Sequence, residues 1–354
     1  MPVEKSADWP EQDLEYINKC PACGAPQSEL FIYGLEDFTY RVAPGVWTLR
    51  RCVECQAAYL DPRPTESSIG RAYGNYYTHN ANMIPPKPLN WSGQGLKGRL
   101  KRGYLNRRFG HNLPSTLPLG WLLTTLEPAR NAATGHLIRH LGAPGRPDAQ
   151  LLDVGCGNGF FLRIAKDLGY KAYGLEPDSD AAEQARKAGF NIVQRSLPNS
   201  GLLNSQFDHV TLNHVFEHLH RPREAAEEIL NLLRPGGRLW LSQPNLRSTG
   251  LTIFGKYWRG LEAPRHLSLY TAESLKDLLE KIGFVNIDSL PPLLNAEMYF
   301  RQSVAMSVGK IPNLSEKICE WTADWKKKTR VADKTAKRNN SRAESLTIVA
   351  FRPM

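Results

Sequence analysis

The sequence lacks any apolar run near the roughly 18 residues that a membrane-spanning helix requires. The longest candidate, residues 117–126, is too short and is interrupted by Pro118 and Gly120. The first ten residues also lack the apolar core of a secretory signal peptide. These absences favour a cytoplasmic protein.

Acidic residues are scarce in two segments of this chain, whose formal net charge is +10. Residues 87–142 carry nine Lys/Arg against one Asp/Glu, and residues 326–342 carry eight against one, whereas residues 149–245 are near neutral. Such segments contact phosphate in nucleic acids, nucleotide sugars or anionic lipids, or they are solvated helix faces. Within the first, Leu96, Leu100 and Tyr104 recur at helical spacing, which favours a helix that packs on its own domain over one on a membrane surface.

One glycine of the dinucleotide-binding pattern is also missing. Residues 151–161 read as an apolar strand, a glycine-rich loop and the start of a helix. A dinucleotide fingerprint that begins at Gly155 requires glycine at position 160, where this chain has Phe160. Glycines still let the loop backbone approach a ligand, and the helix start offers free N–H groups. Residues 171–176 predict a second strand that ends in Glu176, a carboxylate suited to ribose hydroxyls.

Further predicted strands and a helix follow along the chain. Residues 207–219 predict a fourth strand running into a loop, residues 223–233 a helix, and residues 234–245 a turn and a fifth strand. With the pattern Asp-x-Gly-x-Gly-x-Gly at 153–159, this series resembles the class I S-adenosylmethionine (SAM) dependent methyltransferases. The resemblance covers about residues 130–290 plus the last strand. It implies an α/β, Rossmann-like fold, with a seven-stranded sheet and helices on both faces.

The resemblance also assigns cofactor contacts. It places the methionine end of SAM at Asp153, Gly155 and Gly157, and the ribose at Glu176. Further cofactor contacts are expected at Gly159, Ser196, Leu197 and Asn213.

Two loops offer histidines that could take a proton from an acceptor hydroxyl, a role that typically contributes 10²–10⁴-fold. We rank His266 first, with Arg265 beside it as an anion-binding partner, because residues 264–267 resemble a "PRHL" segment of the family. His214 in the strand-four loop is the alternative. The same loop contains a Glu-His pair at 217–218. Instead of a catalytic function, this pair could have a structural one, in which its hydrogen bonds hold the loop in place.

Four of the six cysteines form two C-x-x-C pairs, at Cys20, Cys23, Cys52 and Cys55. In a cytosolic chain such pairs predict a four-thiolate zinc site, with a redox function as the rival interpretation. Two strands predicted between the pairs make this a zinc ribbon, although the 28-residue gap is long and Gln56 stands where glycine is common. The segment resembles the N-terminal zinc ribbon of a group of bacterial methyltransferases linked to sugars and secondary metabolites.

The sequence predicts domains that follow one another along the chain. Residues 1–15 are expected to be disordered, 16–65 to form the ribbon, and 66–147 a helical connecting region. Residues 148–354 are expected to form the methyltransferase domain, with a helical insertion at 292–344 that covers the acceptor.

The function implied is methyl transfer from SAM to a small-molecule acceptor, most simply a hydroxyl of a sugar or secondary metabolite. An RNA methyltransferase and a non-catalytic SAM-binding regulator are the alternatives. The chain has no N/D-P-P-Y/F motif and no paired catalytic cysteines, and its basic faces carry few aromatic residues, which weighs against RNA. The intact glycine loop and its acidic partner weigh against a non-catalytic regulator.

Overall fold

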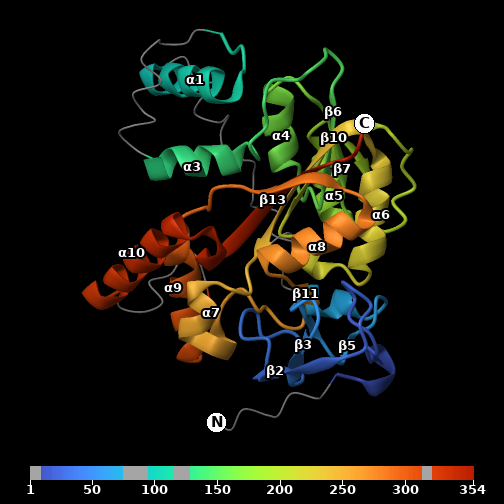
Figure 1. Ribbon diagram of the computed structural model, residues 1–354, viewed down its shortest axis with the longest axis vertical. Helices are drawn as coiled ribbons and strands as arrows, with labels where there is room; N and C mark the ends of the chain where they lie inside the picture. The colour runs from blue at the N-terminus through green and yellow to red at the C-terminus, as the bar shows by residue number, and fades with distance from the viewer. Residues whose placement is uncertain (1–8, 75–94, 115–127, 313–320) are drawn as a thin grey trace. The chain divides into compact units, whose positions relative to one another are not determined.

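A computed structural model describes residues 9–74, 95–114, 128–312 and 321–354 of the chain (Figure 1). The chain divides into two compact units. The first unit comprises residues 1–76, 214–227 and 241–349, and the second comprises residues 77–213, 228–240 and 350–354. The ribbon segment therefore shares a unit with residues 241–349, whereas the sequence had suggested consecutive domains.

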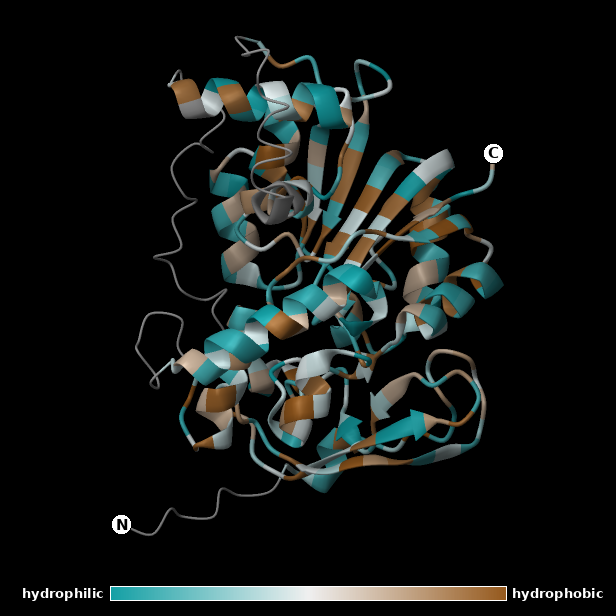
Figure 2. Cartoon of the chain, turned by 60° about the vertical axis from the view of Figure 1, so that its left-hand side comes forward, coloured by the Kyte–Doolittle hydropathy of each residue, from teal (hydrophilic) through white to brown (hydrophobic). Residues whose placement is uncertain are grey.

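A seven-stranded mixed sheet confirms the predicted α/β fold. Its strand order is β12-β13-β10-β9-β6-β7-β8. The strands are β6 (Gln150–Val154), β7 (Lys171–Leu175), β8 (Asn191–Val193), β9 (Phe207–Asn213), β10 (Leu233–Pro244), β12 (Val285–Ser289) and β13 (Ser345–Phe351). β6 pairs in parallel with β7 and β9, and β7 with β8. Hydrophobic residues concentrate on these strands, as expected of a sheet covered on both faces (Figure 2).

The second unit builds its core around β6. Its helices are α1 (Leu96–Phe109), α3 (Pro128–Leu137), α4 (Phe160–Asp167) and α5 (Ser179–Lys187), and α6 (Pro222–Leu232) crosses the division between units. Tyr104 and Leu105 of α1 are buried in one cluster with Ile138, Leu151 and Ile164. The basic helix therefore packs on its own unit, although only Tyr104 of the three apolar residues that favoured this packing is buried, and Leu96 is exposed.

The ribbon in the first unit is a four-stranded antiparallel sheet of order β11-β4-β3-β2. Its strands are β2 (Ser28–Leu35), β3 (Trp47–Cys52), β4 (Ala58–Leu60) and β11 (Ser268–Leu269), and a small separate sheet pairs β1 (Leu14–Glu15) with β5 (Arg63–Pro64). Residues 9–15, expected to be disordered, instead form η1 (Glu11–Asp13) and β1. The reason is apolar burial, since Trp9 packs edge-on against Trp47.

The ribbon does not have a core of its own. Trp47 and Leu60 share one buried cluster with Trp258, Phe300 and Ala332. The helices that contribute are α7 (Thr249–Phe254), α9 (Ala296–Ser307) and α10 (Ala323–Arg338), and α9 packs against the other two (Figure 1). The described part of segment 292–344 thus contains α9 and α10 with loop residues around them, while residues 313–320, with Cys319, lie outside the described residues.

Helix α8 (Ala272–Ile282) begins and ends at residue types that are common at helix ends. Thr271 caps its start in a reciprocal hydrogen-bond pair with Ser274, and Gly283 ends it in a left-handed conformation. The remaining short helices are η2 (Ile69–Tyr73), η5 (Phe216–His218), η6 (Gly255–Tyr257) and η7 (Asn340–Arg342).

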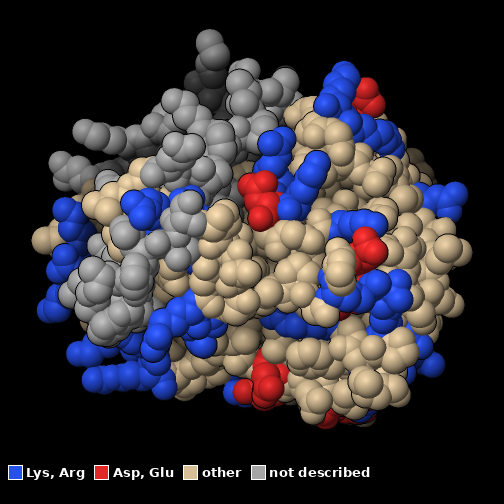
Figure 3. Space-filling view, turned by 90° about the horizontal axis from the view of Figure 1, so that it is seen from above, with Lys and Arg blue, Asp and Glu red and all other residues tan. Residues whose placement is uncertain are grey.

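The described helices are all too short or too polar to cross a membrane. Lys and Arg outnumber Asp and Glu on the face of the molecule in Figure 3, in keeping with the net charge of +10.

Candidate functional site

The loop after β6 leaves its backbone open at one position. Gly155, Gly157 and Gly159 all have positive φ, at 67°, 52° and 84°, a conformation that strongly favours glycine. A Cβ on Gly157 would meet no atom within 4 Å, so a ligand can approach this backbone directly. A Cβ on Gly159 would instead lie 2.9 Å from the Phe190 ring. Gly159 is therefore required by packing, and Gly157 borders open space.

The parallel register brings the expected cofactor residues to one edge of the sheet. Val154 lies opposite Leu175 on β7 and Leu212 on β9. Glu176, which follows β7, and Asn213, the last residue of β9, therefore lie on either side of the end of β6. Ligands of open α/β sheets bind at this edge.

Glu176 is folded back onto the glycine loop. Gly157 N–H donates to its Oε2 (2.8 Å), and Asp178 N–H donates to its Oε1 (3.0 Å). Burial raises the pKa of this carboxyl, and the two N–H donors oppose that rise. The acid thus braces the loop, and each oxygen keeps a lone pair for a further donor. Its contact with ribose stays a prediction.

Asp153 has a partner that sequence reasoning missed. Arg139 Nη1 donates to its Oδ1 and also to Thr211 Oγ1 (2.6 Å), and the guanidinium lies 3.6 Å from the centroid of the Phe161 ring. Asp153 Oδ2 is buried and has no hydrogen-bond partner among the described residues. An unpaired buried acceptor is costly, so this oxygen is suited to a ligand donor. Nothing in the sequence around Arg139 signals its role.

The remaining expected cofactor contacts differ in exposure. Leu197 is buried after β8, Ser196 Oγ donates to its carbonyl (3.2 Å), and Asn213 is exposed at the end of β9. Their contacts with the cofactor stay predictions.

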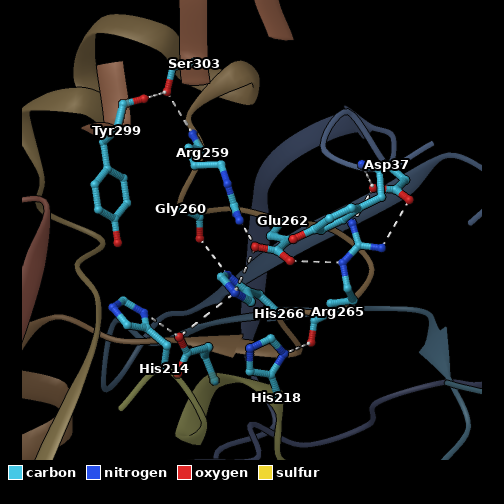
Figure 4. A network of polar contacts seen from close by, with 12 residues as sticks. Asp37, His214, His218, Arg259, Gly260, Glu262, Arg265, His266, Tyr299 and Ser303 are labelled. Atoms are coloured by element: carbon cyan, nitrogen blue, oxygen red, sulfur yellow. Dashed lines mark hydrogen bonds and ion pairs between the residues drawn. The ribbon is translucent and has the colours of Figure 1, made fainter. Parts of the chain in front are cut away.

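A second polar cluster lies in the first unit and begins at His214 (Figure 4). His214 Nδ1 is 3.2 Å from Glu217 Oε1, and the Glu217 side chain is completely buried. The His214 side chain is 35% exposed. Its φ of 55° is uncommon for a residue with a side chain, and its N–H donates to Ser242 O (2.8 Å). The loop therefore holds one partly exposed imidazole against a buried carboxylate.

Two further imidazoles are fixed by backbone carbonyls. His266 Nδ1 is 2.8 Å from Gly260 O, and His218 Nδ1 is 3.0 Å from both Arg265 O and the Tyr73 hydroxyl. Burial lowers the pKa of His266 to about 4. His266 is therefore neutral at pH 7. It is also almost enclosed, whereas the His214 side chain is partly exposed.

The Arg265 guanidinium is paired with carboxylates of the protein itself. Its guanidinium is fully buried and donates to both Asp37 oxygens, to Glu262 Oε1 (3.1 Å) and to Ala72 O (2.7 Å) (Figure 4). Burial alone would raise the pKa of Asp37, but Arg265 holds it below its usual value. The sequence suggested an anion-binding residue, and the anions that it contacts here are these two carboxylates.

The four paired cysteines converge in the first unit. Cys20 Sγ lies 3.6 Å from Cys55 Sγ, Cys23 Sγ lies 3.5 Å from Cys52 Sγ, and all four lie within 4.8 Å of one another. Zinc–sulfur bonds of about 2.3 Å place the sulfurs of a tetrahedral site about 3.8 Å apart. Burial raises the pKa of the Cys23 thiol to about 11, a rise that a bound cation would reverse. The donor set and its size fit Zn²⁺.

The substitution of Gln56 for the usual glycine leaves the second knuckle intact. Gln56 adopts a φ of 63°, close to the 81° of Gly24 in the first knuckle. Its side-chain amide donates to Val53 O (2.8 Å), which holds this conformation.

Comparison with known proteins assigns the segment that carries the glycine loop. Residues 127–289 match the family model of a methyltransferase domain. This segment is a class I SAM-dependent methyltransferase domain. Both the glycine loop and the His214–Glu217 pair lie in the methyltransferase domain, whereas the four cysteines precede it.

Individual relatives agree with the methyltransferase domain over part of the chain. A malonyl-[acyl-carrier protein] O-methyltransferase of Enterobacter lignolyticus is 28% identical over 38% of this chain and 53% of its own length. A ubiquinone biosynthesis O-methyltransferase of Methylococcus capsulatus is 29% identical over 38% of this chain and 59% of its own length. This chain therefore spans little more than half the length of these relatives. A SAM-dependent methyltransferase structure from Archaeoglobus fulgidus covers 65% of this chain and 98% of its own, with 19% identity and a TM-score of 0.42.

Proposed function

We propose that this protein transfers the methyl group of SAM to an oxygen of a small, hydroxylated molecule. The observation that carries the proposal is the open backbone at Gly157, braced by the Glu176 carboxylate. When bound, SAM supplies a methyl group already activated by its sulfonium. The chain then has to hold cofactor and acceptor in line and accept the proton of the hydroxyl.

The cofactor residues divide between two strand ends. In our proposal, the Gly155–Gly157 backbone and the unpaired oxygen of Asp153 hold the methionine end, while the free lone pairs of Glu176 bind the ribose hydroxyls. Arg139 is a positioning residue, because it fixes the Asp153 carboxylate from the protein side.

Calorimetric titration with SAM tests this site. Gly157→Arg fills the open space and strains a left-handed backbone, and Glu176→Ala removes the ribose acceptor together with the brace of the loop. We expect SAM affinity to fall at least tenfold in each variant, since a hydrogen bond to a charged group is worth about 1.5–3 kcal/mol. Glu183→Ala, an exposed carboxylate on α5, is the control and should bind SAM as the wild type does. Unchanged affinity in both site variants would refute the assignment.

For the proton, we propose His214 as the general base, with Glu217 as the group that orients it. Glu217 holds Nδ1 at 3.2 Å, so the other ring nitrogen is left to accept a proton on the partly exposed side. His266, which the sequence ranked first, is 4% exposed and fixed to Gly260 O. We therefore rank His214 above it, while a function for residues 292–344 in covering the acceptor stays a prediction.

His214→Ala should lower turnover about 100-fold or more, the range of lost general-base catalysis, with little change in SAM affinity. Steady-state kinetics together with SAM titration separate the two effects. His220→Ala is the matched control, because this nearby histidine contacts the backbone carbonyl of Pro64 and lies outside the cluster. Full turnover in His214→Ala, with turnover abolished in His266→Ala, would restore the original ranking.

The class of acceptor is proposed from the relatives. Both names specify an O-methyltransferase, one acting on a malonyl-[acyl-carrier protein] and one in ubiquinone biosynthesis. The two differ in acceptor, so their likeness supports an oxygen atom and no particular molecule. A panel of hydroxylated sugars, phenols, carboxylates and RNA with labelled SAM identifies the acceptor. Label transfer to RNA alone would favour the alternative suggested by the basic segments.

We also propose that Cys20, Cys23, Cys52 and Cys55 hold one zinc ion with a structural function. Their distances fit a tetrahedral site, and four protein ligands leave no open position for chemistry.

A further inference from the structure

The polar cluster around Glu217 contains a second group of metal-ligating side chains. Ligand atoms of Glu217, His218 and His266 all lie within 4.8 Å of one another. Glu217 and His218 belong to η5, and His266 directly follows Arg265 in a separate loop. Figure 4 shows the imidazoles directed toward the same space between these segments.

The two histidines are held in the orientation that metal ligands adopt. A carbonyl oxygen only accepts, so the Nδ1 atoms near Gly260 O and Arg265 O carry the ring protons. The Nε2 atoms of both rings therefore have free lone pairs. Histidines that bind metal commonly donate their other nitrogen to a backbone carbonyl in this way, which fixes the tautomer and the ring.

The Glu217 carboxylate gives a second, independent indication of a metal site. Glu217 is completely buried, and its Oε2 has no hydrogen-bond partner among the described residues. Its Oε1 contacts His214, so one oxygen is satisfied and the other is not. Leaving a charged acceptor buried without a partner costs more free energy than leaving a neutral one in the same state.

Charge in the surrounding network is also unbalanced. Asp37 and Glu262 form ion pairs with Arg265, and Glu262 forms another with Arg259. These two carboxylates are matched by two guanidinium groups, which leaves Glu217 as a third buried carboxylate with only imidazoles beside it. A cation bound by the Glu217 carboxylate would supply the charge that the described side chains do not.

We propose that Glu217, His218 and His266 bind a divalent first-row transition metal ion. Two imidazole nitrogens and one carboxylate oxygen suit Zn²⁺, Fe²⁺ or Mn²⁺, and three protein ligands leave positions open for water or an acceptor oxygen. The site differs in chemistry from the closed four-thiolate site. This metal site is an addition to the proposed methyl transfer. It is compatible with that function, because the contact between Glu217 Oε1 and His214 remains in place.

Metal stoichiometry tests the proposal directly. Wild-type protein is equilibrated with Zn²⁺, passed through a desalting column and measured by elemental analysis, and we expect two equivalents per chain. A parallel titration with Co²⁺ distinguishes the sites, because thiolate ligation gives intense sulfur-to-cobalt charge-transfer bands and nitrogen–oxygen ligation gives only weak visible bands. The second equivalent should appear without an increase in the charge-transfer bands.

Variants assign the second equivalent to its ligands. Glu217→Gln keeps the shape and removes the charge, and His266→Ala removes a nitrogen ligand. Each should weaken binding of the second Co²⁺ at least tenfold and leave the charge-transfer bands intact, which also shows that the ribbon remains folded. His220→Ala is the control and should retain both equivalents. A wild-type protein that binds one equivalent only, or a second equivalent that survives both substitutions, would overturn the proposal.

Discussion

Replacing Cys20 and Cys52 by serine is expected to empty the four-thiolate site and to destabilise the whole first unit. Structural zinc contributes about 10–16 kcal/mol in isolated zinc fingers, where little else holds the fold. Here Trp47 and Leu60 of the ribbon belong to a larger buried cluster, which retains part of that stability. We therefore expect a loss of at least about 3 kcal/mol in the free energy of unfolding, measured by urea denaturation alongside zinc content.

The fifth cysteine of the described residues gives a control for that experiment. Cys156 is buried in the glycine loop of the second unit, whereas the four-thiolate site belongs to the first. Cys156→Ala should keep the thiolate-bound zinc and lose far less stability. If the double serine variant is free of that zinc and unfolds at the same urea concentration as wild type, the ribbon does not depend on metal.

Removing the Arg265 side chain should be nearly as damaging, although no ligand is lost. Arg265→Ala leaves Asp37 and Glu262 buried without their shared cation, and breaking such a pair typically costs 3–5 kcal/mol. Arg265→Lys keeps the charge but loses most hydrogen bonds of the planar guanidinium. Its loss in the free energy of unfolding should therefore be intermediate. Urea denaturation measures both variants.

An exposed ion pair provides the comparison. Arg51 contacts Glu29 on the ribbon surface, where both side chains are at least a third exposed. Arg51→Ala should cost less than about 1 kcal/mol, as surface pairs do. Equal losses in Arg51→Ala and Arg265→Ala would show that burial does not set the strength of the Arg265 network.

The elements that the sequence predicted well are those with local signals. β6 and β13 contain short apolar runs, and α8 lies between a Thr271 cap and Gly283. The loop at 155–159 is specified by glycines whose positive φ requires them. Each of these depends on neighbours within a few residues, so pattern and structure coincide.

The elements that the sequence missed depend on distant partners. β11 has only two residues, and it becomes a strand because Ser268 and Leu269 pair with β4 of the ribbon. Asp37 and Arg265 are 228 positions apart, so no spacing rule connects them. The ranking of His266 over His214 had the same weakness. The ranking of the two histidines depends on the exposure of each side chain and on the group that contacts its Nδ1 atom. The local sequence specifies neither.

The late position of β11 has a consequence for synthesis of the chain. Strands β2, β3 and β4 leave the ribosome before β11, which is translated roughly 200 residues after β4, about 10–40 s later at ordinary elongation rates. During that interval β4 is an open sheet edge, and the apolar side chains of Leu49 and Leu60 lack the partners that bury them. A nascent chain at this stage is therefore a natural client for chaperones, and a truncation before Ser268 should yield a ribbon prone to aggregation.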